Sequence, residues 1–288
     1  MLRSAALLST LALAACATVP EQTTPALVDH GPTLSQIDRV LPGTYLSSRD
    51  RAQRERGESP LTLNIERMPS QQPGQTGFVL RQRRADEPPR HFLLAMEGSA
   101  TADQLAGAFA PLDESGAVRN RCEMRFSLRV NGFSGETDPR NCRFGPDQSI
   151  GLVKEVAFDG NQLVIADRLL NLNTGEPHGV DQIHRFVRIQ SYSGWAGRRE
   201  AGGWRLAREF SLQAGNAITL EDVAGMALGV DLEMELISLR DSDQIILRLS
   251  AMDTETGQLL AQSWADPGAE AIGLALPDFQ IGLSLLQN

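Results

Sequence analysis

The 288-residue sequence contains only three cysteines, four histidines and one lysine, and these scarcities exclude several classes of site. The histidines, His30, His91, His178 and His184, are scattered and show no zinc-ligand spacing, and no Cys-x-x-Cys redox motif is present. There is no HExxH motif, P-loop or dinucleotide fingerprint. With a formal charge of −9, the chain also lacks the basic surface of a nucleic-acid-binding protein.

Candidates for catalysis are few. The segment Gly132-Phe133-Ser134-Gly135 resembles half of a nucleophile elbow, but the motif is not completed, so we interpret Ser134 as a turn or strand hydroxyl. Three charged residues, Glu155, Asp167 and Arg168, fall on two neighbouring predicted strands. They form either a surface ion pair or a polar patch at the mouth of a cavity, and the sequence leaves both interpretations open.

The first sixteen residues have the pattern of a bacterial lipoprotein signal. Arg3 precedes an apolar run at 5–14 that is too short to span a bilayer, and Leu13-Ala14-Ala15-Cys16 follows. An ordinary secretory signal with an incidental cysteine is the alternative. We expect Cys16 to carry the lipid, and Ala17, where a retained lipoprotein would have aspartate, favours an outer-membrane anchor that faces the periplasm.

Lipidation of Cys16 leaves Cys122 and Cys142 as a pair in an oxidising compartment. The segment between them, 122–142, reads as two short strands joined by a turn at Asn131-Gly132. We therefore expect a disulfide across this hairpin. Closing a loop of about 20 residues stabilises a protein by roughly 3 kcal/mol in the chain-entropy model.

Alternating apolar and polar residues, as in LTLNIE at 61–66, predict a chain made mainly of strands. The further predicted strands are 77–82, 91–96, 123–130, 132–137, 152–158, 162–167, 182–190, 204–212, 232–239, 244–251, 259–263, 272–276 and 279–285. Many short strands with frequent turns indicate an antiparallel barrel or sandwich. Predicted helices are 34–41, 47–56, 101–109 and 219–227, while 191–204 reads as a loop or boundary.

Several short motifs, in a fixed order, resemble the CpcT/CpeT family of phycobilin chromophore lyases. The central motif is Cys122, then Phe133-x-Gly135-x-Thr137, then Cys142. The flanking pieces that agree in order are Gly43-Thr-Tyr45 with Gln53, Gln82 with Pro89 and Arg90, Glu155-Val156, Asp167-Arg168, Gly179, and Phe186 to Arg188. The match covers residues 36–190.

The resemblance implies a calycin-like antiparallel β-barrel over 33–197, after a signal peptide at 1–15 and a tether at 16–32. A β-rich extension of unknown role follows at 198–288, which either continues the barrel or forms a separate module. In the family, the barrel receives an open-chain tetrapyrrole and assists its thioether attachment to a cysteine of a client protein. Arg90 and Arg168 would then bind the propionates, and Asp167 or Glu155 the pyrrole nitrogens.

Tyr45, Gln53 and Gln82 would line the cavity, with ordinary barrel packing as the alternative for Tyr45 and Gln82. Phycobiliprotein assembly is intracellular, so an envelope location argues against lyase activity here. The second hypothesis is therefore a non-enzymatic envelope lipoprotein that binds a small apolar ligand or a protein partner. Apart from a bilin as ligand we expect no cofactor, no metal and no nucleic acid. A protein client and a second copy of the chain stay open as partners.

Overall fold

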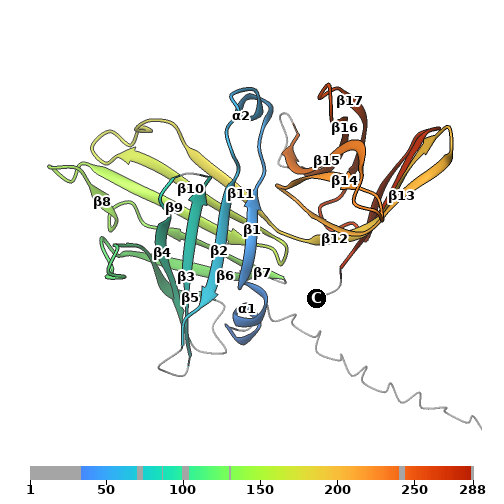
Figure 1. Cartoon of the computed structure of the whole chain (residues 1–288). Coiled ribbons are helices and arrows are strands. Elements are labelled where there is room, and N and C mark those ends of the chain that lie inside the picture. The colour runs from blue at the N-terminus through green and yellow to red at the C-terminus, as the bar shows by residue number, and fades with distance from the viewer. Residues whose placement is uncertain are drawn as a thin grey trace, which may run out of the picture.

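The computed structural model describes residues 34–69, 74–85, 87–98, 104–129, 131–239 and 244–286. A β-barrel and a smaller β-sandwich lie side by side (Figure 1). The prediction of a mainly all-β chain with an antiparallel barrel is confirmed. The predicted signal peptide, Cys16 and the tether lie outside the described residues.

Ten antiparallel strands form the barrel, which closes because β9 pairs with β10. In chain order they are β1 (Gly43–Ser47), β2 (Leu61–Arg67), β3 (Gln75–Arg84), β4 (Arg90–Glu97), β5 (Gln104–Leu112), β6 (Cys122–Arg129), β7 (Gly132–Thr137), β9 (Ile150–Phe158), β10 (Gln162–Asn171) and β11 (Gln182–Arg188). The two-residue strand β8 (Arg143–Phe144) pairs with β9 outside this ring.

The barrel forms because apolar residues recur at every second position and so face one side of each strand. In β2, for example, Leu61, Leu63 and Ile65 are buried in the barrel core, whereas the intervening Thr62 and Asn64 are partly exposed. Aromatic rings from β6, β7 and β9 fill much of the interior, and the ring centroids of Phe126 and Phe133 lie 5.8 Å apart.

The two ends of the barrel differ. Helix α1 (Leu34–Val40) covers one end, where Ile37 and Leu41 join the barrel core (Figure 1). At the other end, which we call the mouth, the loop between β1 and β2 carries the short helix α2 (Arg51–Glu55). A capping box between Asp50 and Gln53 begins this helix.

Cys122 and Cys142 form the predicted disulfide, with Cα atoms 5.1 Å apart. It ties the start of β6 to the loop that follows β7 and therefore closes the β6–β7 hairpin at the mouth end.

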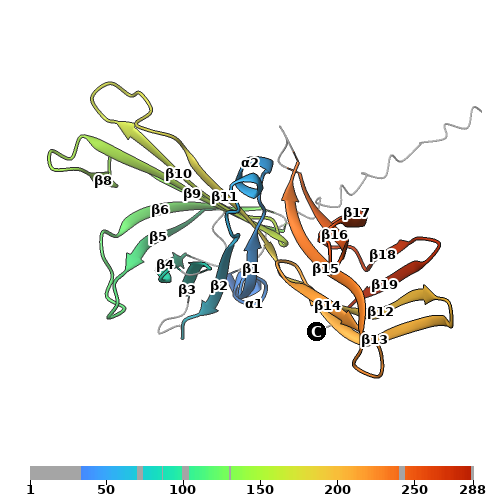
Figure 2. The ribbon, with the colours of Figure 1, turned by 45° about the horizontal axis from the view of Figure 1, so that its top comes forward.

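The C-terminal strands form a separate module and do not extend the barrel. Two four-stranded sheets, β13-β12-β19-β18 and β14-β15-β16-β17, pack face to face over a second apolar core. Their strands are β12 (Ser191–Glu200), β13 (Gly203–Gln213), β14 (Ala217–Glu221), β15 (Ala227–Ser238), β16 (Ile245–Asp253), β17 (Leu259–Ala265), β18 (Ala271–Ala275) and β19 (Phe279–Leu285). Figure 2 shows this sandwich beside the barrel from a second direction.

Three local predictions are wrong. Residues 104–109, predicted as helix, belong to β5, because pairing with β4 and β6 outweighs the helical spacing of Leu105 and Phe109; residues 101–103 lie outside the described chain. In the predicted helix at 219–227, the Asp222 carboxylate instead accepts backbone hydrogen bonds that hold a turn between β14 and β15. Residues 191–204, predicted as a loop or a boundary, are not a loop, because they form β12, a turn and the start of β13. The change from barrel to sandwich does fall at the start of this segment, so residues 191–197 pair within the sandwich.

Candidate ligand-binding cavity

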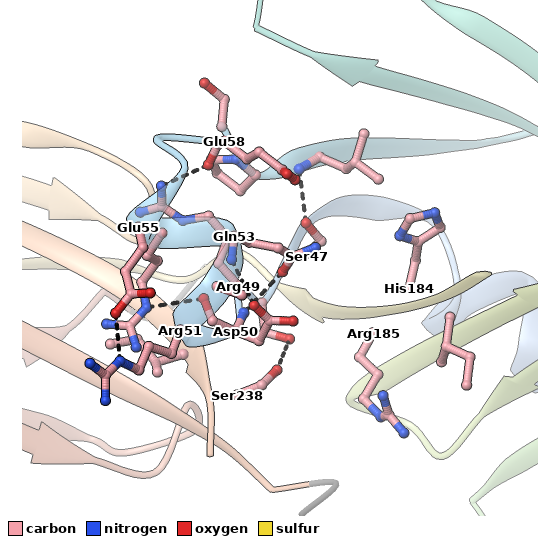
Figure 3. A pocket seen from close by; sticks show the side chains of 18 of the residues that line it. Ser47, Arg49, Asp50, Arg51, Gln53, Glu55, Glu58, His184, Arg185 and Ser238 are labelled. Carbon is pink, nitrogen blue, oxygen red and sulfur yellow. Dashed lines mark hydrogen bonds and ion pairs between the residues drawn. The ribbon is translucent and has the colours of Figure 1, made fainter. Parts of the chain in front are cut away.

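A cavity of about 840 Å³ lies where the mouth of the barrel meets the sandwich. Its walls come from the β1–β2 loop with α2, from the mouth ends of β3 and β11, and from β15 and β17 of the sandwich. In Figure 3, the α2 side chains and Glu58 lie on one side of this space, and His184 and Arg185 lie on the other. A cavity of this size between two bodies is typical of a small-molecule site.

Arginine dominates the polar lining. Five arginines face three carboxylates in the wall, although the whole chain carries a formal charge of −9. The arginines are Arg49, Arg51, Arg54, Arg84 and Arg185, and the carboxylates are Asp50, Glu55 and Glu58. The wall therefore holds two more guanidinium groups than carboxylates, although Arg49, Arg51 and Arg84 are paired with Glu235, Glu55 and Glu58.

Arg54 has no ion pair among the described residues, although its Nε donates a hydrogen bond to the Asp50 carbonyl. Burial lowers the pKa of the Arg54 guanidinium, and the neighbouring Arg248 lowers it further, while Glu235 acts in the opposite direction. A cation whose protonated form is disfavoured in this way is stabilised when an anion binds nearby. The neighbouring charges therefore act, on balance, against the Arg54 cation.

One cross-strand row forms the sandwich wall. Glu235 of β15, Arg248 of β16 and Trp264 of β17 are direct register partners on the outer face of their sheet. The Glu235 carboxylate pairs with Arg248 and also with Arg49 of the barrel. The Arg248 guanidinium lies 5.7 Å from the centre of the Trp264 ring, which is half exposed and lines the cavity. The wall therefore offers a planar aromatic surface beside the arginines.

Inside the mouth, further charged groups face the barrel interior. Lys154 of β9 is buried and pairs with Asp167, its register partner on β10. Its ammonium nitrogen also lies 4.5 Å from the centre of the Phe109 ring. Burial lowers the pKa of the nearby His184, an effect that Arg84 increases and Asp167 opposes. The mouth is therefore polar, whereas the interior beneath it is apolar.

The structure brings three of the residues proposed from the sequence to this inner face. Asp167 lies there as described above, and Gln82 and Arg90 are register partners on the same face of β3 and β4. Gln82 faces the barrel interior because it lies two positions after the buried Leu80 on β3. Arg90 faces the same side because it is the register partner of Gln82. These three residues form the rim of the mouth.

Glu155 and Arg168 lie elsewhere, on the outer surface of the barrel. Glu155 follows the inward-facing Lys154, and Arg168 follows the inward-facing Asp167. Successive side chains of a strand point to opposite faces, so Glu155 and Arg168 point away from the interior. The Arg168 guanidinium lies 3.5 Å from Glu155 and 3.2 Å from Asp181, and all three side chains are exposed. They form a surface ion-pair network, which was one of the two interpretations that the sequence left open.

Two further predicted residues have structural partners. Tyr45 is fully buried near the closed end, where its hydroxyl donates to the Leu41 carbonyl (2.7 Å) and accepts from Arg188 (2.7 Å). Gln53 lines the cavity, but its side-chain oxygen accepts from the Asp50 backbone at the start of α2.

Sequence reasoning missed the arginines of the β1–β2 loop, Lys154, His184 and Trp264. The arginines of the β1–β2 loop could have been noticed in the sequence, because four of the eight residues from Arg49 to Arg56 are arginine. Lys154 was visible as the chain's single lysine. Trp264 carried no local signal, because its position beside the mouth depends on how the sandwich packs.

Within the described ranges, no group of three or more His, Cys, Asp or Glu side chains is arranged to hold a metal ion. Of the helices that the structure describes, none is both long and apolar enough to cross a membrane.

No protein-family model matches the chain, and no curated protein sequence is significantly similar to it. These comparisons therefore do not identify the CpcT/CpeT family.

Proposed function

We propose that this protein binds an amphiphilic anion in the cavity between the barrel mouth and the sandwich. The observation that carries the proposal is the lining of five arginines against three carboxylates in a chain that is acidic overall. Carboxylate groups of the ligand would bind the guanidiniums, which favour such groups by bidentate hydrogen bonding.

The remainder of the ligand would be apolar and partly planar. Trp264 supplies an aromatic surface on one wall, and apolar side chains elsewhere in the lining come from Leu61, Ile183, Ile237 and Leu239. An open-chain tetrapyrrole with two propionates meets this description, and it is the ligand class that the CpcT/CpeT resemblance implies. The cavity volume of about 840 Å³ is in the range of ordinary small-molecule sites.

Binding without catalysis is the simpler form of this function. Of the serines in the wall, Ser47 accepts from the Leu61 backbone and Ser48 bonds to Ser238, so neither is paired with His184. None of the described lining residues is a cysteine, so the lyase activity that the resemblance implies would join the bilin to a thiol of a client protein.

An envelope location favours the binding role over the lyase role. This location is itself a proposal, which rests on the expected lipid at Cys16. Intact mass spectrometry of the protein purified from cell membranes would detect the acyl chains. An unmodified Cys16 would remove the lipid anchor from the proposal while leaving the cavity unaffected.

The cavity is tested by titrating the protein with phycocyanobilin and, separately, with the anionic dye 1-anilinonaphthalene-8-sulfonate. We expect both to bind, and we expect Arg54→Ala and Trp264→Ala each to weaken binding about tenfold, the effect of roughly 1.4 kcal/mol. Arg56→Ala is the matched control, since Arg56 belongs to the same segment but does not line the cavity and pairs with Glu58.

The proposal is wrong if neither probe binds, or if Arg54→Ala and Arg56→Ala bind equally well. Dye binding without bilin binding would keep the anion site and remove the tetrapyrrole as its ligand.

A further inference from the structure

The sandwich presents a second candidate site on the outer face of its β13-β12-β19-β18 sheet. Arg208, Trp195, Gly282 and Gly273 are successive register partners across the four strands, so they form one row. Their neighbours along the strands, such as Ala196, belong to the sandwich core, so the row faces outward. The barrel packs against the other sheet, through Glu235 of β15.

Trp195 stands at the centre of this face and is 46% exposed. Its indole lies over Gly282, where an added Cβ would come within 3.1 Å of the ring nitrogen. Glycine at 282 therefore lets the indole lie against the sheet, and Gly273 continues the flat floor on the next strand.

Hollows of about 420 and 360 Å³ flank the indole. The first lies over β13 and contains Arg208 and Glu209; the second lies over β19 and β18 and contains Gly273 and Ser284. Trp195 lines both hollows, so together they form a track that crosses the strands and passes over the ring.

A β-bulge sets the polar side chains of the track. The β12–β13 register shifts between Gly194 and Trp195, and Glu209 is the extra residue on β13, with a φ of +59°. With this bulge, the consecutive residues Arg208 and Glu209 both line the first hollow together with Trp195. In the part of the chain that the structure describes, neither the Arg208 nor the Glu209 side chain has an ion pair or a hydrogen-bond partner.

We propose that this face binds a glycan, with one pyranose ring stacked on Trp195. A pyranose has an apolar face of C–H groups and a rim of hydroxyls, each of which can both donate and accept. The indole face attracts the polarised C–H groups, while Arg208 donates two hydrogen bonds and Glu209 accepts from adjacent hydroxyls. The hollows on both sides of the ring leave room for neighbouring sugars, so the ligand is an oligosaccharide that crosses the strands.

A glycan fits this face better than a bilayer does. Proteins that insert into a bilayer interface present an apolar surface, whereas this track, although partly apolar, also carries the charged Arg208 and Glu209 and the hydroxyl of Ser284. The site is separate from the proposed cavity, because it lies on the opposite sheet of the sandwich and shares no lining residue with the cavity.

The test is a calorimetric titration of the full chain with chitohexaose and with cellohexaose. We expect binding of at least one of them, with at least a tenfold loss in Trp195→Ala and a several-fold loss in Arg208→Ala and in Glu209→Ala. Trp204→Ala is the matched control, since Trp204 is similarly exposed (43%) on the same sheet but lies over Gly197 and outside both hollows.

Circular dichroism of each variant checks that the sandwich remains folded. Three results would overturn the proposal: no binding of either hexasaccharide, equal losses in Trp195→Ala and Trp204→Ala, or Trp195-dependent binding to phosphatidylglycerol vesicles in place of the sugars. Loss of sugar binding with retained bilin and dye binding would separate this site from the proposed cavity.

Discussion

The Arg49 guanidinium of the barrel pairs with the buried Glu235 carboxylate of the sandwich, and this contact joins the two bodies at the cavity. The backbone reinforces the pair, because the Arg49 N–H donates to the Leu236 carbonyl (3.2 Å) and the Ser238 N–H donates to the Arg49 carbonyl (3.1 Å). Glu235 also holds Arg248. One carboxylate therefore pairs with two partly buried cations from different bodies, and the trio keeps one net positive charge.

Glu235→Ala should destabilise the protein by about 3–5 kcal/mol, because it leaves both guanidiniums without their carboxylate in a largely buried place. Urea unfolding followed by tryptophan fluorescence measures this. Glu55→Ala is the control: its pair with Arg51 is exposed, so the cost should be below about 0.5 kcal/mol. Equal midpoints for the two variants would contradict a structural role for Glu235.

Tyr45→Phe should cost about 1–3 kcal/mol, since it leaves the Leu41 carbonyl and one Arg188 donor without the hydroxyl between them. Burial raises the pKa of Tyr45 to about 12, although Arg188 acts to lower it. An absorbance titration of the folded protein should accordingly show one of the two tyrosines ionising only near pH 12. A phenolate at Tyr45 near pH 10 would mean that the hydroxyl is not buried.

Reduction of the Cys122–Cys142 disulfide should lower the free energy of unfolding by roughly 3 kcal/mol, because the bridge closes a loop with a sequence separation of 20. Urea midpoints with and without reductant give the difference. The Cys122→Ser/Cys142→Ser variant should match the reduced protein and be insensitive to reductant. No change on reduction in the wild type would show that the pair is not bonded in solution.

Acidification should destabilise the barrel through His184. Burial holds the pKa of His184 below its ordinary value of 6.5, so the unfolded chain binds the proton more readily than the folded chain. The contribution is therefore fully present above pH 6.5 and is lost as the pH falls through the lowered pKa. Urea midpoints between pH 7.5 and 5 measure it, and His184→Gln should flatten the slope in this range. An unchanged slope in the variant would assign the effect to other groups.

Much of the fold follows from local pattern. Segments with strict alternation, such as 61–66 and 123–130, were predicted as strands, and their described residues, 61–66 and 123–129, are strands, because a period of two fits only a pleated backbone with one buried face. The prediction for 104–109 was wrong because its small and apolar residues fit both the helical period of 3.6 and the strand period of two. Pairing with the neighbouring strands β4 and β6 makes this segment a strand.

The same period explains which predicted site residues come together. Asp167 and Arg168 are adjacent in the sequence, so on a strand they must face opposite sides, and only Asp167 reaches the interior. The resemblance to the lyase family predicted both Asp167 and Arg168 as ligand-binding residues and did not say which one faces the interior. The strand pairing does, because Asp167 is opposite the inward-facing Lys154 and Arg168 is opposite Val153.

The sequence by itself determined the all-β class and the strands of the barrel other than β1 and β5, because alternation and turn residues act over a few neighbours along the chain. The small number of cysteines, together with the expected role of Cys16, gave the Cys122–Cys142 pair. Only the tertiary structure decided where the cavity lies. Its walls join Ser48 to Ser238, which are 190 positions apart, and no local pattern encodes which faces of two separately folded bodies meet. That choice depends on contacts between residues far apart in the sequence, such as the ion pair of Arg49 and Glu235.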